Sequence, residues 1–190
     1  LPSLDNACVA APYCDNLTVI GGNEDEVNRH LKNLIRIFED KGFKLHDIEF
    51  ASLSSQALGK IFDGGQLRVM PRLERVQLLQ AAFRHIASGA YVSGEQVEVL
   101  IGHFISEALI CRPALAVLRA RYSFVTDSYY VKQPLWMSCR REALVVVGIL
   151  PLFIAPLGQP WCERVVVTDA SPTGWGICQA VLPPAQVREI

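Results

Sequence analysis

Two aspartates stand where a rigid carboxylate could hold a metal ion. Asp15 lies in Tyr13-Cys14-Asp15-Asn16, between apolar segments at 8–14 and 17–21 that predict a β-hairpin. Asp and Asn tolerate the backbone of a two-residue hairpin turn, so the turn is predicted at Asp15-Asn16. Nucleotide polymerisation uses rigidly held carboxylates to bind two magnesium ions at the transferring phosphate. An ordinary surface turn can contain the same residues. The choice between a metal-binding hairpin and a surface turn therefore depends on the rest of the chain.

The second aspartate, Asp169, ends an apolar strand predicted over residues 164–169. A turn at 171–174 leads from it into a second strand predicted over 175–182. Strands that end in aspartate are common in α/β enzymes. The motif is therefore compatible with a metal site without defining a reaction.

The elements between the two aspartates are predicted to be mainly helical. Asn23 is a plausible N-cap for a helix that ends at Gly42. Residues 43–51 and 56–69 look extended, with a turn at 63–65. Helices are then predicted from Pro71 to Gly89, from Ser93 to Pro113, over about 113–124 and over about 139–150. The apolar stripe of the first of these contains Leu73, Val76, Leu79, Phe83 and Ile86.

Composition and charge bound the possible functions only loosely. The chain has 190 residues, is 51% hydrophobic and carries a net charge of −1, which favours a packed fold over disorder. Residues 64–141 hold ten Lys/Arg against five Asp/Glu. Such an excess can follow a phosphate backbone, although it is more often a solvated face. The candidate nucleic-acid-binding residues are Arg68, Arg72, Arg75, Arg84 and Lys132.

Several other classes of site are disfavoured. The six cysteines show no zinc-ligand spacing, and in a chain with this much core we expect reduced thiols in an intracellular compartment, cytoplasm or nucleus. No secretory signal is expected. Residues 143–158 are uncharged but fall short of the roughly 20 residues of a membrane span. Pro151 and Pro156 interrupt them, so a buried helix ending near Leu150 is predicted in their place.

The order of motifs resembles that of reverse transcriptases. Tyr13, Cys14, Asp15 and Asn16 resemble the Tyr-x-Asp-Asp box, with Asn16 where the family has its second Asp. Residues 42–46 resemble the segment that closes the palm. Residues 57–64, with Leu58 and Gly59, resemble the primer grip, and residues 97–104, with Gly102, resemble the thumb. There Gly102 would allow close helix packing.

The C-terminal part resembles the opening of RNase H, in which Asp169 would bind metal. This motif spans residues 165–176 and contains Asp169, Ser171, Gly174, Trp175 and Gly176. The preceding stretch, with Leu150-Pro151-Leu152 and Pro160-Trp161, resembles the linker of DIRS-like elements, which use a tyrosine recombinase.

The resemblance implies an α+β fold with a partial polymerase palm, a helical thumb and the start of an RNase H-like α/β domain. The expected divisions are a palm over 1–70, a thumb over 71–125, a connection over 126–160 and RNase H strands over 161–190. The expected function is that of a fragment of a retrotransposon RNA-directed DNA polymerase with attached RNase H. Asp15 and Asp169 would be its catalytic metal ligands and Mg²⁺ its cofactor.

The implied partners are an RNA/DNA template-primer and, in the parent enzyme, deoxynucleotides; no membrane partner is expected. We expect the chain alone to be inactive, because the family needs a further palm Asp and fingers before the hairpin, and further RNase H acids after residue 190. Two alternatives stay open. One is a non-catalytic helical module that binds nucleic acid or protein, and the other is a membrane-associated protein that uses residues 143–158.

Overall fold

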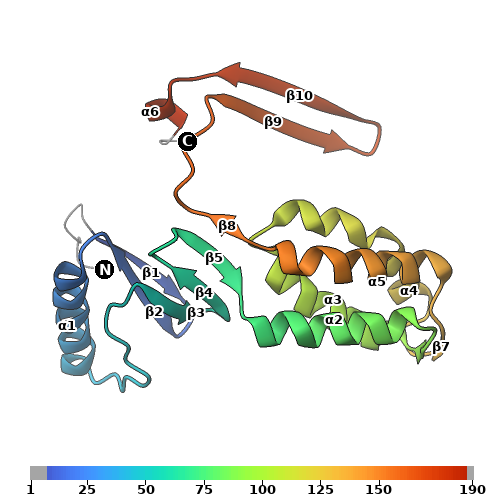
Figure 1. The fold of residues 1–190 in the computed structure, drawn as a ribbon, viewed down its shortest axis with the longest axis horizontal. Coiled ribbons are helices and arrows are strands. Elements are labelled where there is room, and N and C mark those ends of the chain that lie inside the picture. The colour runs from blue at the N-terminus through green and yellow to red at the C-terminus, as the bar shows by residue number, and fades with distance from the viewer. Residues whose placement is uncertain (1–7, 188–190) are drawn as a thin grey trace. The chain divides into compact units, whose positions relative to one another are not determined.

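The computed structural model describes residues 8–187, in a mixed α+β arrangement (Figure 1). The chain divides into two compact units after Ala155. The first unit holds the Asp15 hairpin, a small sheet and a helical bundle, and the second holds the Asp169 hairpin. The expected coarse class, α+β, is confirmed.

The N-terminal hairpin and its helix form as their local signals predict. Strands β1 (Cys8–Tyr13) and β2 (Asn16–Gly21) pair antiparallel, and α1 (Glu24–Asp40) packs against them. The Asn23 side chain accepts a hydrogen bond from Glu26 N at 3.1 Å, as expected of an N-cap. Val27 and Leu34 supply the buried face of α1.

A four-stranded sheet follows, in the order β3-β4-β5-β8. Its first three strands, β3 (Ser54–Ala57), β4 (Lys60–Asp63) and β5 (Arg68–Pro71), are successive antiparallel neighbours, and β8 is the short Ala155–Pro156. Residues 43–51, expected to be extended, contain no strand.

Two further predictions in this region were wrong. Leu58 and Gly59 do not lie in a strand: they form the β3–β4 turn, at φ of 52° and 74°. Pro71 does not open a helix. It pairs with Lys60 as the last residue of β5, and the helix begins two residues later.

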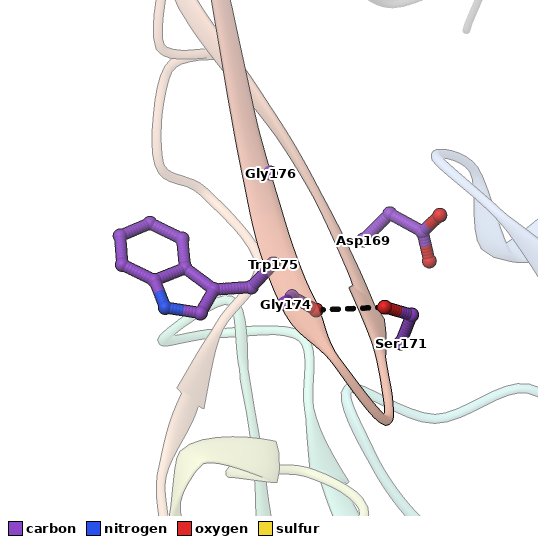
Figure 2. A pocket seen from close by; sticks show the side chains of 5 residues that line it. All are labelled: Asp169, Ser171, Gly174, Trp175 and Gly176. Carbon is purple, nitrogen blue, oxygen red and sulfur yellow. Dashed lines mark hydrogen bonds between the residues drawn. The ribbon is translucent and has the colours of Figure 1, made fainter.

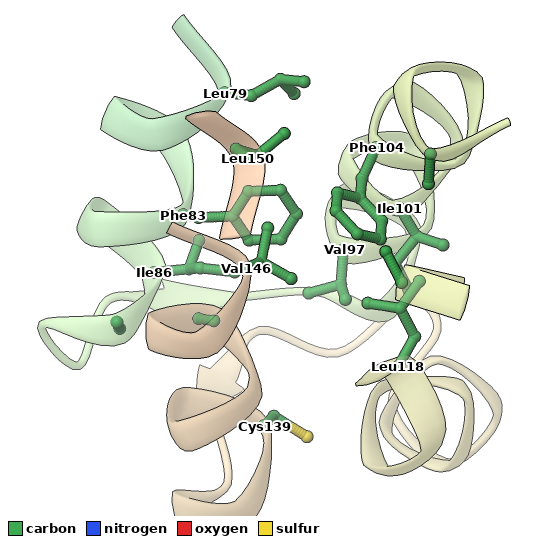
Figure 3. Packing of buried hydrophobic residues seen from close by; sticks show 14 of the residues in the cluster. Leu79, Phe83, Ile86, Val97, Ile101, Phe104, Leu118, Cys139, Val146 and Leu150 are labelled. Carbon is green, nitrogen blue, oxygen red and sulfur yellow. The ribbon is translucent and has the colours of Figure 1, made fainter. Parts of the chain in front are cut away.

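The helical bundle (Figure 1) contains the main apolar core, whose packing Figure 3 shows. Its helices are α2 (Leu73–Ala87), α3 (Gly94–Ala108), the 3₁₀ segment η1 (Arg112–Leu118), α4 (Arg119–Asp127) and α5 (Met137–Ile149). Short strands β6 (Tyr91–Val92) and β7 (Gln133–Pro134) pair at one end. The capping box predicted at Ser93 and Gln96 is confirmed, because both of its hydrogen bonds form.

The uncharged run at 143–158 belongs to this core. Ala143, Val146 and Leu150 are fully buried there, and α5 packs along α2. The buried helix that was predicted to end near Leu150 is therefore confirmed. None of the helices within residues 8–187 combines the length and apolar character that a membrane crossing requires. Leu73, by contrast, was assigned to the buried stripe of α2 but is 63% exposed.

Arg121 is buried in the middle of this bundle with incomplete pairing. Its guanidinium lies 4.6 Å from the Phe83 ring centre, and its Nη2 donates to the carbonyl of Cys139 at 3.3 Å. Nε and Nη1 have no hydrogen-bond partner among the described protein groups. Burial lowers the pKa of Arg121 to about 10, against the opposing effect of the Glu142 charge. The burial of this cation is therefore only partly compensated.

Replacing Arg121 by methionine is expected to leave the free energy of unfolding unchanged or to raise it by about 1–2 kcal/mol. Methionine has a similar length and removes a buried cation whose Nε and Nη1 lack hydrogen-bond partners, while Glu142 keeps the hydrogen bonds from the backbone N of Ala120 and of residue 121. Urea unfolding at pH 7 measures this. Arg121→Ala is the control and should be destabilising, since it leaves a cavity. A large loss of stability in both variants would mean that the charge itself stabilises the bundle.

The second unit is a long two-stranded hairpin. Strands β9 (Arg164–Ser171) and β10 (Gly174–Val181) pair antiparallel over eight residues each, and α6 (Pro184–Val187) follows. Both predicted strands are confirmed, although β9 continues two residues beyond Asp169.

Candidate functional sites

Asp15 lies at the tip of the β1–β2 hairpin. Tyr13 and Asn16 are paired, so the two turn residues are Cys14 and Asp15. The predicted turn, Asp15-Asn16, was therefore one residue too late. The left-handed position is taken by Cys14, at φ 51°. Asp15 is exposed and its Oδ1 accepts a hydrogen bond from Asn16 Nδ2 at 3.2 Å.

The Tyr13 side chain adds little enclosure to this tip, because it is 61% exposed. The arrangement offers one carboxylate and one amide oxygen to solvent. Such a pair could contribute to a hard cation such as Mg²⁺, which is commonly held by one or two carboxylates together with substrate phosphates and water.

Asp169 lies on one face of the β9–β10 hairpin, beside an open depression lined by Asp169, Ser171, Gly174, Trp175 and Gly176 (Figure 2). Its Oδ1 accepts a hydrogen bond from Ala170 N at 2.9 Å. Ser171 Oγ donates to the carbonyl of Gly174 at 3.2 Å, which closes the end of the hairpin. Figure 2 shows the indole of Trp175 on the opposite side of the ribbon from Asp169 and Ser171.

The two glycines keep the Asp169 carboxylate accessible. Gly176 is the register partner of Asp169, and Gly174 is the partner of Ser171. A Cβ at either glycine would meet no atom within 4 Å. Because cross-strand partners share a face of the ribbon, these glycines leave the space beside the carboxylate open.

Neither aspartate belongs to a complete metal site within residues 8–187. No group of three or more His, Cys, Asp or Glu side chains in that range is arranged to hold an ion. Each position supplies a single carboxylate, so Asp15 and Asp169 fit the implied Mg²⁺ only as part of a larger donor set. No catalytic step follows from the described residues alone.

The five candidate nucleic-acid-binding cations divide into two groups. Arg68 and Arg75 have carboxylate partners inside the chain: Arg68 Nε lies 3.2 Å from Asp63 Oδ2, and Arg75 Nε lies 3.5 Å from Glu107 Oε1. Arg72, Arg84 and Lys132 are exposed. Arg75 and Arg84 are nine residues apart on α2, so they project about 180° from each other at 3.6 residues per turn. The five cations therefore do not form one continuous stripe.

The glycine expected to allow close helix packing is not the one that does. A Cβ at Gly102 would meet nothing within 4 Å, whereas one at Gly94 would lie 2.5 Å from the Val125 carbonyl oxygen and 2.8 Å from Tyr129 Cα. Gly94 follows the Ser93 cap directly, and nothing in the local sequence distinguishes it from an ordinary first helical residue.

Comparison with known proteins adds no relative: no protein-family model matches the chain, and neither the curated proteins nor the solved structures include a match.

Proposed function

We propose that these residues belong to an RNA-directed DNA polymerase with attached RNase H, of the kind that retrotransposons encode. The proposal is carried by the order of elements along the chain. A tight hairpin with Asp15 at its tip is followed by its packing helix, then by a second tight turn at Leu58-Gly59, then by a helical bundle. The Asp169 hairpin comes last.

The exposure of the two aspartates also supports the proposal. Both aspartates are exposed on regular two-stranded hairpins, and neither forms an ion pair with a cation of the described residues. A carboxylate that binds a metal ion must be accessible to that ion, and both Asp15 and Asp169 are exposed to solvent. Asn16 at the position of the second family Asp remains the main departure.

We expect a polypeptide of residues 1–190 not to extend a DNA primer on an RNA template with Mg²⁺ or Mn²⁺. Two-metal catalysis stabilises both the attacking and the leaving oxygen, and a single carboxylate at the Asp15 tip cannot hold two ions there. Radiolabelled nucleotide incorporation measures this. Robust incorporation that is lost in Asp15→Ala would contradict the interpretation of the site as incomplete.

The same polypeptide is expected to bind an RNA–DNA hybrid weakly and with salt sensitivity. Each phosphate contact should contribute about 0.9 to the slope of log K against log salt, so Arg84→Gln and Lys132→Gln should each reduce that slope. Fluorescence anisotropy between low and moderate salt measures it. Arg68→Gln is the matched control, because Arg68 is already paired with Asp63 and should change the slope least. Undetectable binding at low salt would remove the nucleic-acid part of the proposal.

A further inference from the structure

A buried carboxylate joins the small sheet to the helical bundle. Glu107, near the end of α3, is 2% exposed. Its Oε2 lies 2.7 Å from the Nζ of Lys60 in β4, and its Oε1 lies 3.5 Å from the Nε of Arg75 in α2. Lys60 is itself only 7% exposed. Each oxygen of one carboxylate thus engages a different element, and we call Lys60, Arg75 and Glu107 the ionic joint.

The apolar core does not make this connection. Among the described residues, the buried apolar cluster of the bundle begins at Val76 and contains no residue of β3, β4 or β5. The sheet has its own buried apolar residue, Val69, outside that cluster. The sheet is therefore attached to α3 through a charge pair rather than through continuous apolar packing.

The second cation of the joint is oriented by another contact. Arg75 Nη2 lies 2.7 Å from His103 Nδ1, one turn before Glu107 on α3. An arginine only donates hydrogen bonds, so Nδ1 is the acceptor in this geometry. Arg75 therefore contacts two residues of α3, His103 and Glu107, and the His103 contact helps to orient its guanidinium toward Glu107 Oε1.

Buried ion pairs contribute little net stability, because desolvation offsets their attraction, and their best-supported role is to fix one arrangement among several. We propose that the ionic joint is a positioning device that fixes the orientation of the β3–β4–β5 sheet, and with it the Leu58-Gly59 turn, on the helical bundle. Lys60 occupies the strand position directly after that turn and pairs with Ala57, so its ion pair acts at the turn end of the hairpin. The proposal does not depend on polymerase ancestry.

The test measures a distance rather than stability. Spin labels are placed at two exposed positions, Gln56 in β3 and Val99 in α3, through cysteines introduced there. The accessible native cysteines are first replaced by serine; they are Cys14, Cys111, Cys162 and Cys178. The unmodified joint is expected to give one narrow distance peak by pulsed electron spin resonance.

Lys60→Met and Glu107→Gln should each replace that peak by a broad distribution, while amide exchange in α2 and α3 stays slow. Arg68→Gln breaks the Arg68–Asp63 pair in the same sheet and is the matched control, with an unchanged peak. If Glu107→Gln fails to fold, Glu107→Asp keeps the charge and shortens its reach, and the same broadening is expected. A narrow, unshifted peak in the folded joint variants would overturn the proposal.

Discussion

Replacing Phe104 by alanine is expected to lower the free energy of unfolding by about 3–5 kcal/mol, the range for deleting a buried phenylalanine. Phe104 has no exposed surface, and its ring lies 5.9 Å from that of Phe83 and 5.8 Å from that of Phe153, centre to centre. It therefore links α2, α3 and the segment after α5. The loss is a large fraction of the 5–15 kcal/mol that typically holds a domain folded.

Val99→Ala is the matched control for this experiment. Val99 lies on the same helix but is 58% exposed, so its truncation creates no cavity and improves helix propensity. Urea unfolding followed by circular dichroism measures both variants. Equal, small effects of Phe104→Ala and Val99→Ala would contradict the packing of α3 into the bundle.

Gly94→Ala is expected to cost about 1–3 kcal/mol, the usual penalty for forcing atoms into a packed site. The added Cβ would meet backbone atoms of Val125 and Tyr129, which cannot rotate away. Moving them would also disturb the hydrogen bonds from Gly94 N to the Ser128 carbonyl, at 2.8 Å, and from Glu95 N to the Tyr129 carbonyl, at 3.1 Å. These bonds satisfy two of the free amides at the start of α3.

Gly102→Ala is the opposite case on the same helix. Gly102 is exposed with open space around it, so alanine should raise the free energy of unfolding by about 0.5–1 kcal/mol through helix propensity alone. Thermal unfolding of the two variants separates the effects by sign. A destabilising Gly102→Ala would restore the close packing that the sequence suggested for this glycine.

Local signals in the sequence predicted those parts of the fold that depend on near neighbours. The Asn23 cap, the Ser93–Gln96 capping box and the two aspartate-bearing hairpins all formed, because each is defined within a few residues. The Asp15 turn was misplaced by one residue because Cys14, rather than Asn, adopts the left-handed conformation. Aspartate and asparagine favour that conformation, but the pairing register of the two strands, with Tyr13 opposite Asn16, placed the turn at Cys14 and Asp15.

Features that depend on distant contacts could not be predicted in the same way. The role of Gly94 is set by a carbonyl 31 residues away in sequence, and Lys60 meets Glu107 across 47 residues. Leu73 fits the α2 stripe by spacing, but lies exposed at the helix start. In each case the partner is supplied by another element, and the periodicity of a single helix does not encode it.

The candidate sites likewise have a part that the local sequence predicts and a part that depends on distant residues. Asp15 and Asp169 could be singled out from their hairpins, and both lie exposed on those hairpins. A complete donor set, however, is built from several elements. The proposed polymerase activity therefore needs further metal ligands beside Asp15, and the proposed RNase H activity needs further metal ligands beside Asp169.

The most direct test of the proposed function is the sequence of the full transcript that encodes these residues. The account predicts that the reading frame continues on both sides. Upstream it should encode a further palm strand bearing aspartate, preceded by the fingers, and downstream it should encode the remaining RNase H acids. A frame that opens a few codons before Leu1 and stops shortly after Ile190 would contradict it.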